Sequence, residues 1–209
     1  MSATRVLRRR WGLCSIVFLA MAALGCNPRD GHQDTDSTPT PNVAANDDAL
    51  PELQLGNKST YDSVLQESRG QVVLVDFWAT WCAPCIQQFP HTVELGNRYR
   101  EQGLRVIAVS MNEPSDRAKV LEFLKRSKAH GVSSLLTEYG AGSAFVEAFD
   151  LRGDIPFYRL YDRNGVLRYS FSNEPEGIEH CESIERIEER IQQLLNEEMA
   201  SPPLQAGGS

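Results

Sequence analysis

The chain has 209 residues and a formal net charge of -7, which suits one globular domain with tails, or two small domains. An acidic chain is a poor candidate for nucleic-acid binding, which favours basic surfaces. Five cysteines are too few for a disulfide scaffold at this length. They are Cys14, Cys26, Cys82, Cys85 and Cys181.

Residues 1–26 have the pattern of an export signal. A segment that is basic up to Arg10 precedes a mostly apolar stretch from Trp11 to Gly25. This stretch is short for a membrane span, which needs about 20 residues, and suits the apolar region of a signal peptide. The Arg9-Arg10 pair hints at twin-arginine export, but the rest of that motif is weak and we favour the general route. A retained signal anchor is the alternative.

The signal ends at Ala23-Leu24-Gly25-Cys26, which resembles a bacterial lipobox. Gly25 and Cys26 fit that pattern, whereas Ala23 and Leu24 are less usual. We expect Cys26 to become a lipidated N-terminus that tethers a soluble domain to a membrane surface. The alternative is ordinary cleavage nearby, which would release a soluble exported protein.

The next part of the chain predicts a linker followed by a domain. Residues 27–50 are rich in Asp, Ser, Thr and Pro and poor in apolar residues, so we expect a disordered spacer that gives the domain reach. The folded domain is expected over residues 51–198. Residues 199–209 contain Pro202-Pro203 and Gly207-Gly208, and we expect a flexible tail.

Strands and helices alternate through the expected domain. Ser59 or Thr60 would cap the first helix, and the Asn164-Gly165 pair signals a hairpin turn. The order predicts an α/β fold: a mixed sheet with helices on both faces. The expected helices cover 61–66, 83–101, 114–129, 143–149 and 182–197, and the expected strands cover 71–78, 104–110, 133–137, 157–161 and 166–171.

The strand at 71–78 leads directly into Cys82-Ala83-Pro84-Cys85, a dithiol at a strand-to-helix turn. Thiol–disulfide exchange needs one thiolate to attack and a second thiol to resolve the mixed disulfide. Unpaired N–H groups at a helix N-terminus favour the thiolate. We therefore predict that Cys82, on the exposed side of the turn, is the nucleophile and that the more buried Cys85 resolves. Pro84 is compatible with a first helical turn.

Asp76 is an acid inside the otherwise apolar run. A buried carboxylate is costly without a task or partners, and burial should raise its pKa. That suits a group that takes a proton from Cys85. The alternatives are an exposed edge position or a structural, hydrogen-bonded acid. The local sequence at Ile155-Pro156 does not decide between cis and trans, since cis occurs in only about 5% of such bonds.

Val75 to Cys85 closely resembles the active-site segment of the thioredoxin superfamily, over a match of roughly residues 52–196. With the export signal and linker, the chain looks most like the TlpA/ResA-like extracytoplasmic thiol–disulfide oxidoreductases. The resemblance implies a thioredoxin fold, a helix-kinking Pro90, and a cis Pro156 that faces Cys82. It also matches Asp76 to the buried acid of thioredoxins.

Two departures from the family pattern stand out. Gln88 occupies the position, three residues after the second cysteine, where TlpA/ResA-like proteins carry a Glu, so Asp76 could take over its acid–base task. The segment Arg152 to Phe157 has one residue more than usual, and Phe157 replaces a common Thr. The substrate-facing loop is therefore expected to differ.

Other assignments of these residues are weaker. A zinc site would need two further ligands, and His91 is more simply a surface residue, so we expect no metal and no cofactor. We expect Cys181 to be a free thiol at the start of the last helix and Trp78 to be core. Residues expected to contact substrate are Trp81, Ala83, Pro84, Ile155 and Pro156.

The sequence thus predicts a thiol–disulfide oxidoreductase, most simply a reductase of protein disulfides that include apocytochrome c by analogy. We expect a monomer on the periplasmic side of a bacterial membrane, lipid-anchored and re-reduced by a membrane electron donor. A peroxiredoxin-type peroxidase is disfavoured because Ala79 stands where that family needs Thr or Ser. A non-catalytic binding module is disfavoured because Cys82 and Cys85 are both intact.

Overall fold

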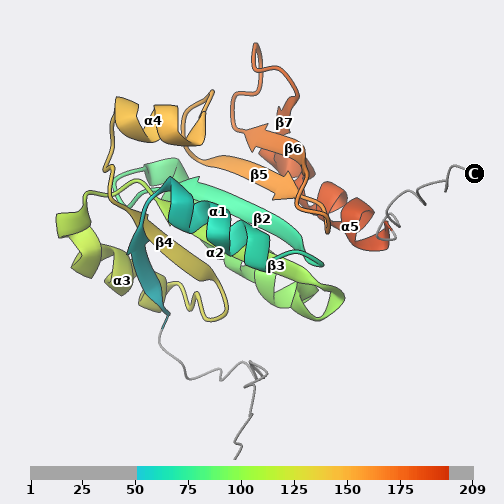
Figure 1. Cartoon of the computed structure of the whole chain (residues 1–209), viewed down its shortest axis with the longest axis horizontal. Coiled ribbons are helices and arrows are strands. Elements are labelled where there is room, and N and C mark those ends of the chain that lie inside the picture. The colour runs from blue at the N-terminus through green and yellow to red at the C-terminus, as the bar shows by residue number, and fades with distance from the viewer. Residues whose placement is uncertain (1–50, 198–209) are drawn as a thin grey trace, which may run out of the picture. The chain divides into compact units, whose positions relative to one another are not determined.

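The computed structural model describes residues 51–197, which form one α/β domain (Figure 1). The predictions for the signal, Cys26 and the linker lie outside the described residues, as do those for residues 198–209. Within residues 51–197, no helix is long and apolar enough to cross a bilayer.

A mixed sheet of seven strands forms the middle layer, in the order β1-β4-β3-β2-β5-β6-β7. Strand β2 is central; it pairs in parallel with β3 and antiparallel with β5. The strands are β1 (Leu53–Gly56), β2 (Val72–Trp78), β3 (Leu104–Ser110), β4 (Ser133–Thr137), β5 (Phe157–Tyr161), β6 (Leu167–Ser172) and β7 (Cys181–Ser183).

Helices cover both faces of the sheet, which confirms the predicted layers (Figure 1). Phe77 packs edge-on against Phe145 and Phe149 of α4, whereas Trp78 packs on Phe89 of α2 and on α3 from the other face. The helices are α1 (Lys58–Glu67), α2 (Ala83–Tyr99), α3 (Arg117–Arg126), α4 (Ser143–Phe149) and α5 (Ile187–Asn196), with 3₁₀ turns η1 (Arg100–Gln102), η2 (Pro114–Asp116) and η3 (Ile184–Arg186).

Strand β2 is apolar except for Asp76 because each of its faces is covered by helices. All seven of its residues are buried, including Asp76. Alternation along a strand sends neighbouring side chains to opposite faces, so Phe77 and Trp78 enter different halves of the core. The chain leaves the sheet at Trp78, where β2 ends, and the two cysteines follow at the start of α2.

Several expected boundaries are wrong. Strand β1 was not predicted, since four residues give little pattern. The N-cap of α1 is Asn57 rather than Ser59 or Thr60, and its side chain accepts from the Ser59 and Thr60 N–H groups. The Thr60 hydroxyl completes a capping box by accepting from the Asn57 N–H. Helix α3 ends at Arg126. The last helix begins at Ile187 because residues 181–183 form β7 instead, so Cys181 lies in a strand.

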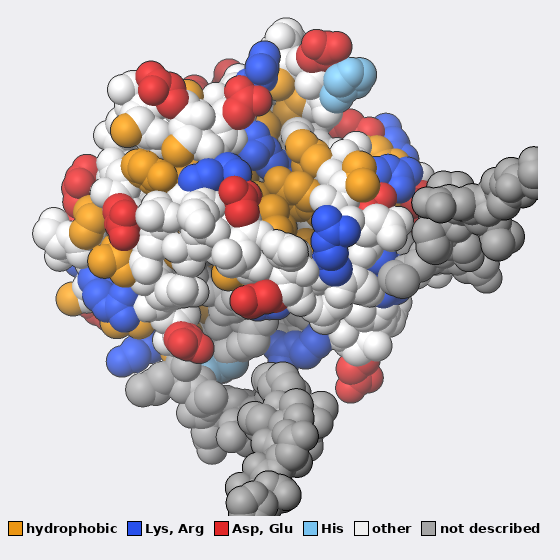
Figure 2. Space-filling model, viewed as in Figure 1, with side chains coloured by type: hydrophobic (Ala, Val, Ile, Leu, Met, Phe, Trp, Pro, Cys, Tyr) orange, Lys and Arg blue, Asp and Glu red, His pale blue; other side chains and the backbone are white. Residues whose placement is uncertain are grey.

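The expected hairpin between β5 and β6 is confirmed. Asp162 Oδ1 accepts hydrogen bonds from the N–H groups of Asn164 and Val166, and Gly165 has a φ of 75°, the left-handed conformation that glycine adopts readily. On the face shown in Figure 2, hydrophobic side chains gather over β5 and β6. Val166 in the hairpin turn and Leu167 at the start of β6 are exposed.

Candidate active site

The two cysteines lie where β2 gives way to α2. Cys82 is the N-cap residue of α2, and its sulfur accepts a hydrogen bond from the Cys85 N–H at 3.2 Å. An N-cap acceptor satisfies one of the unpaired N–H groups of the first turn, and the helix dipole favours negative charge there. The position therefore stabilises a thiolate at Cys82.

Cys82 and Cys85 form a disulfide with an S–S distance of 2.07 Å. Cys85 is 2% exposed, as expected for the inner sulfur, but Cys82 is only 6% exposed. The expectation that Cys82 lies on an exposed side of the turn is thus wrong for the oxidised form, because the surrounding loops pack around the sulfur. In the oxidised form, a partner can reach Cys82 only at the small part of its surface that stays accessible, the opening to the site.

The loop before β5 supplies one wall of this opening. The Ile155–Pro156 peptide bond is cis, which confirms the expectation drawn from the family resemblance. The Cys82 Sγ lies 3.4 Å from the Ile155 carbonyl oxygen, so the cis-proline loop and the reactive sulfur face one another. The Ile155 backbone is therefore placed to contact whatever binds at Cys82.

The other residues expected to contact substrate are distributed around the disulfide. Trp81 is 56% exposed, and Ala83 and Pro84 are also exposed, whereas Ile155 is half-buried and Pro156 is buried. Trp78, in contrast, belongs to the core, where it packs on aromatic rings of α2 and α3, as expected. The exposed surface beside Cys82 thus includes the indole ring of Trp81, just before the start of α2.

Asp76 is 1% exposed on the central strand, which rules out an edge position. Its Oδ2 accepts a hydrogen bond from the Thr92 hydroxyl at 2.8 Å, and its Oδ1 has no hydrogen-bond partner among the described residues. Burial raises the pKa of Asp76 to about 7, although the Thr92 hydrogen bond lowers it. A carboxyl that titrates near neutrality, with one oxygen unengaged, can accept and return a proton.

Three residues of this site were missed by the sequence analysis. Thr92 of α2 and Tyr158 of β5 lie beside Asp76, and Tyr158 is its register partner across β2 and β5. Asn112, which is fully buried, accepts from the Thr80 N–H and donates to the Thr80 hydroxyl, and so fixes the turn before Cys82. The signal that could have found it is an Asn two residues after an apolar strand, where a buried polar side chain needs hydrogen-bond partners.

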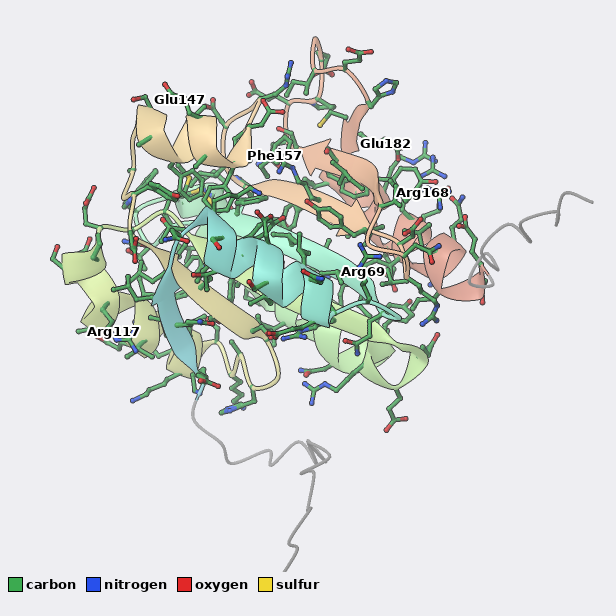
Figure 3. The ribbon with its side chains drawn as sticks, viewed as in Figure 1. Arg69, Arg117, Glu147, Phe157, Arg168 and Glu182 are labelled. Carbon is green, nitrogen blue, oxygen red and sulfur yellow. A yellow bond between two sulfur atoms is a disulfide. The ribbon has the colours of Figure 1, made fainter. Side chains whose placement is uncertain are left out.

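The unusual loop before the cis-proline is anchored at both ends. Arg159 donates to the Asp150 carbonyl at 2.8 Å and lies over the rings of Phe77 and Phe157. A Cβ on Gly153 would meet the Cδ1 of Ile178 at 2.9 Å, so the segment after β6 packs directly on this loop. Figure 3 labels Phe157, at the point where the loop enters β5 beside α4.

The other residues considered from the sequence, Cys181 and His91, are not part of the Cys82–Cys85 disulfide. Cys181 is an unpaired, half-buried thiol in β7, and burial raises its pKa. Such a thiol is a poor nucleophile at neutral pH. Among residues 51–197, no group of three or more His, Cys, Asp or Glu side chains is arranged to hold a metal ion. His91 is half exposed on α2 and lies 3.9 Å from Glu94.

A dithiol at the N-terminus of a helix, opposite a cis-proline on a central mixed sheet, defines a thioredoxin-like site. The chain belongs to the Redoxin family, whose profile matches residues 44–185. It is also similar to the thiol-disulfide oxidoreductase ResA of Geobacillus kaustophilus, with 30% identity over 137 residues that cover 64% of this chain and 75% of the relative.

A second ResA, from Halalkalibacterium halodurans, is 46% identical over 103 residues, which cover 49% of this chain and 54% of that protein. The thioredoxin domain of a thiol-disulfide oxidoreductase from Bacteroides vulgatus matches with a TM-score of 0.50 at 20% identity, over 63% of this chain and 84% of that one, which shows the shared fold. The protein is a TlpA/ResA-like member of the thioredoxin superfamily and a thiol–disulfide oxidoreductase.

Proposed function

We propose that this protein reduces disulfides in exported proteins by means of Cys82, Cys85 and Asp76. The observation that supports this most directly is the Cys82 sulfur, which is held at the helix N-terminus and lies 3.4 Å from the Ile155 carbonyl of the cis-proline loop. An extended segment of substrate can lie along that loop with its disulfide at Cys82. Trp81, Ala83, Pro84 and Pro156 shape the opening.

The reaction has two exchange steps. The Cys82 thiolate attacks one sulfur of the substrate disulfide, and the other substrate sulfur leaves as a thiolate. Cys85 then loses its proton to Asp76, and its thiolate attacks the Cys82 sulfur. The first substrate sulfur leaves, so the substrate gains two electrons and the Cys82–Cys85 disulfide forms.

The direction of transfer follows from the reduction potential of the pair. A potential near that of thioredoxin, about -270 mV, supports a reductase, whereas a potential near about -120 mV means an oxidase. We expect the reducing value, and equilibration of Cys82 and Cys85 with glutathione or dithiothreitol buffers measures it. An oxidising value would overturn the proposed direction and leave the exchange chemistry in place.

Insulin reduction tests the activity itself. The domain from residue 50 onward should turn over, Cys82→Ser should lose that activity, and Cys181→Ser should keep it. Cys85→Ser should accumulate a mixed disulfide with a protein substrate, because the resolving thiol is missing. Absence of thiol-dependent turnover, both with insulin and with a second disulfide-bearing protein, would overturn the proposal.

The cellular setting is part of the same proposal. The signal-like residues 1–26 support export, Cys26 supports a lipid anchor on the periplasmic side of a membrane, and residues 27–50 supply reach. Re-reduction of Cys82–Cys85 then needs a membrane protein that carries reducing power across the bilayer. Apocytochrome c thiols are one substrate class, proposed by analogy with ResA-like proteins.

A further inference from the structure

A cavity of about 370 Å³ lies between α2, the sheet and the C-terminal segment. Its inner wall includes Leu74 of β2, Thr92 of α2 and Tyr158 of β5, and its outer wall includes Ile184 of η3 and Glu188 of α5. The cavity thus lies on the same sheet face as Asp76. Its volume and polar lining are sufficient for several water molecules.

Two hydroxyl groups connect Asp76 to this cavity. The Thr92 hydroxyl lies 2.8 Å from Asp76 Oδ2 and 3.5 Å from the Tyr158 hydroxyl. When Thr92 donates its only hydroxyl proton to the carboxylate, its oxygen can accept from Tyr158. The chain therefore runs Tyr158 to Thr92 to Asp76 when the acid is ionised, and it can reverse when the acid is protonated.

Asp76 needs such a connection because the disulfide face is closed when a substrate is bound. Asp76, Cys82 and Cys85 are nearly inaccessible already in the free protein. A protein joined to Cys82 covers the small accessible part of that residue. A proton taken from Cys85 at that moment has to leave by another side of the domain.

We propose that Thr92 and Tyr158 form a proton relay that links the Asp76 carboxyl to water in the cavity between α2 and α5. The protonated carboxyl gives its proton to the Thr92 oxygen, the Thr92 hydroxyl proton passes to the Tyr158 oxygen, and the Tyr158 hydroxyl proton passes to a water molecule. Every group ends neutral except the carboxylate and the hydronium formed. The inference rests on the proposed role of Asp76 and adds its route to solvent.

The surroundings of the relay suit this task. Burial and the charge of Asp76 hold the pKa of Tyr158 well above its ordinary value, so its hydroxyl stays a donor at neutral pH. The charged or titratable groups around the cavity are His91 on α2, Glu185 in η3 and Glu188 on α5. Glu188 is held by the Tyr99 hydroxyl and by Arg98, which leaves the outer wall polar.

Proton exchange at Asp76 can be measured without turnover. In the full-length oxidised protein, buffered below the pKa of Asp76, the C=O stretch of the protonated carboxyl is identified by its loss in Asp76→Asn. Its shift after mixing with D2O then reports the exchange rate. Thr92→Val and Tyr158→Phe should slow this exchange by about tenfold or more, the scale expected for losing one hydrogen-bonded link. Thr92→Ser should restore it.

The matched control is Tyr161→Phe. Tyr161 also lies in β5, but its hydroxyl bonds to Tyr61 at 2.9 Å on the opposite face of the sheet, so its loss should leave exchange unchanged. Equal exchange rates in wild type, Thr92→Val and Tyr158→Phe would overturn the relay, and so would equal slowing by Tyr161→Phe. Because no turnover is needed, a failed relay and a failed insulin assay remain separate results.

Discussion

At the scale of single residues, Asp76 is a buried acid whose ionisation is opposed by the fold. A carboxylate buried in the central strand loses its hydration and gains back one hydrogen bond, from Thr92. Burial therefore raises its pKa to about 7, well above the ordinary value of an aspartate. The fold accepts this penalty near neutral pH, where the carboxyl can take up or release a proton.

The penalty predicts an unusual pH dependence of stability. The folded-state pKa of Asp76 is raised, so its contribution is fully present below the unfolded value and is lost as pH rises through about 7. The free energy of unfolding of the oxidised wild type should therefore fall by about 4 kcal/mol between pH 4 and pH 8 relative to Asp76→Asn. Urea denaturation at several pH values across this range measures the free energy of unfolding of both proteins. The same dependence of this free energy on pH in wild type and Asp76→Asn would contradict the prediction.

Asn112 leads to a second prediction. Asn112→Ala removes both hydrogen bonds that Asn112 makes to Thr80 and leaves the half-buried Thr80 N–H without its acceptor, which should cost about 1–3 kcal/mol. Because Thr80 begins the turn that carries Cys82, the rate of insulin reduction should fall as well. Thermal unfolding and the insulin assay check both effects. Asn97→Ala, an exposed amide on α2, is the control; a loss of stability no greater than in this control would refute the role of Asn112.

At the scale of elements, the site depends on segments that are distant in sequence. Helix α5 is tied to α2 through Glu188, which accepts hydrogen bonds from Tyr99 at 2.7 Å and from Arg98 at 2.6 Å. Arg190 forms a forked pair with Glu182 of β7, on the side of the sheet where Figure 3 labels Glu182 and Arg168. These ties hold the C-terminal segment over the cavity.

The contact between the cis-proline loop and the segment after β6 gives a third prediction. Gly153→Ala places a methyl group against Ile178 Cδ1 and should cost about 1 kcal/mol, the low end for overpacking because the clashing atom ends a flexible side chain. Ile178→Val deletes that atom, so the double variant should recover most of the loss. Chemical denaturation of the wild type, the two single variants and the double variant gives the coupling energy between residues 153 and 178. If the losses of stability in the single variants simply add in the double variant, the two residues do not pack directly.

At the scale of the whole molecule, the lipid anchor proposed at Cys26 predicts how the protein partitions between detergent and water. If Cys26 carries a lipid, wild-type protein should partition into the detergent phase and Cys26→Ala should remain in the aqueous phase. Cys181→Ala, which changes a cysteine inside the folded domain, is the matched control and should partition as wild type does. Equal partitioning of wild type and Cys26→Ala would rule out a lipid at Cys26.

Much of the fold could be predicted because its signals are local. The apolar run of β2, the glycine at the end of the hairpin turn and the small helix at 143–149 were all read correctly from sequence. The short strands β1 and β7 were missed, since three or four residues hold too little periodicity. Their pairing depends on neighbours that are distant in the chain.

The sequence by itself determined the dithiol chemistry, because Cys82 and Cys85 need only a two-residue spacing and a helix start to meet. Only the tertiary structure decided what surrounds them. It placed Ile155 against Cys82 from 73 residues away and enclosed Asp76 with Thr92 and Tyr158. The physical reason is that pKa shifts and substrate access arise from burial and from contacts between strands and helices, which the local sequence does not record.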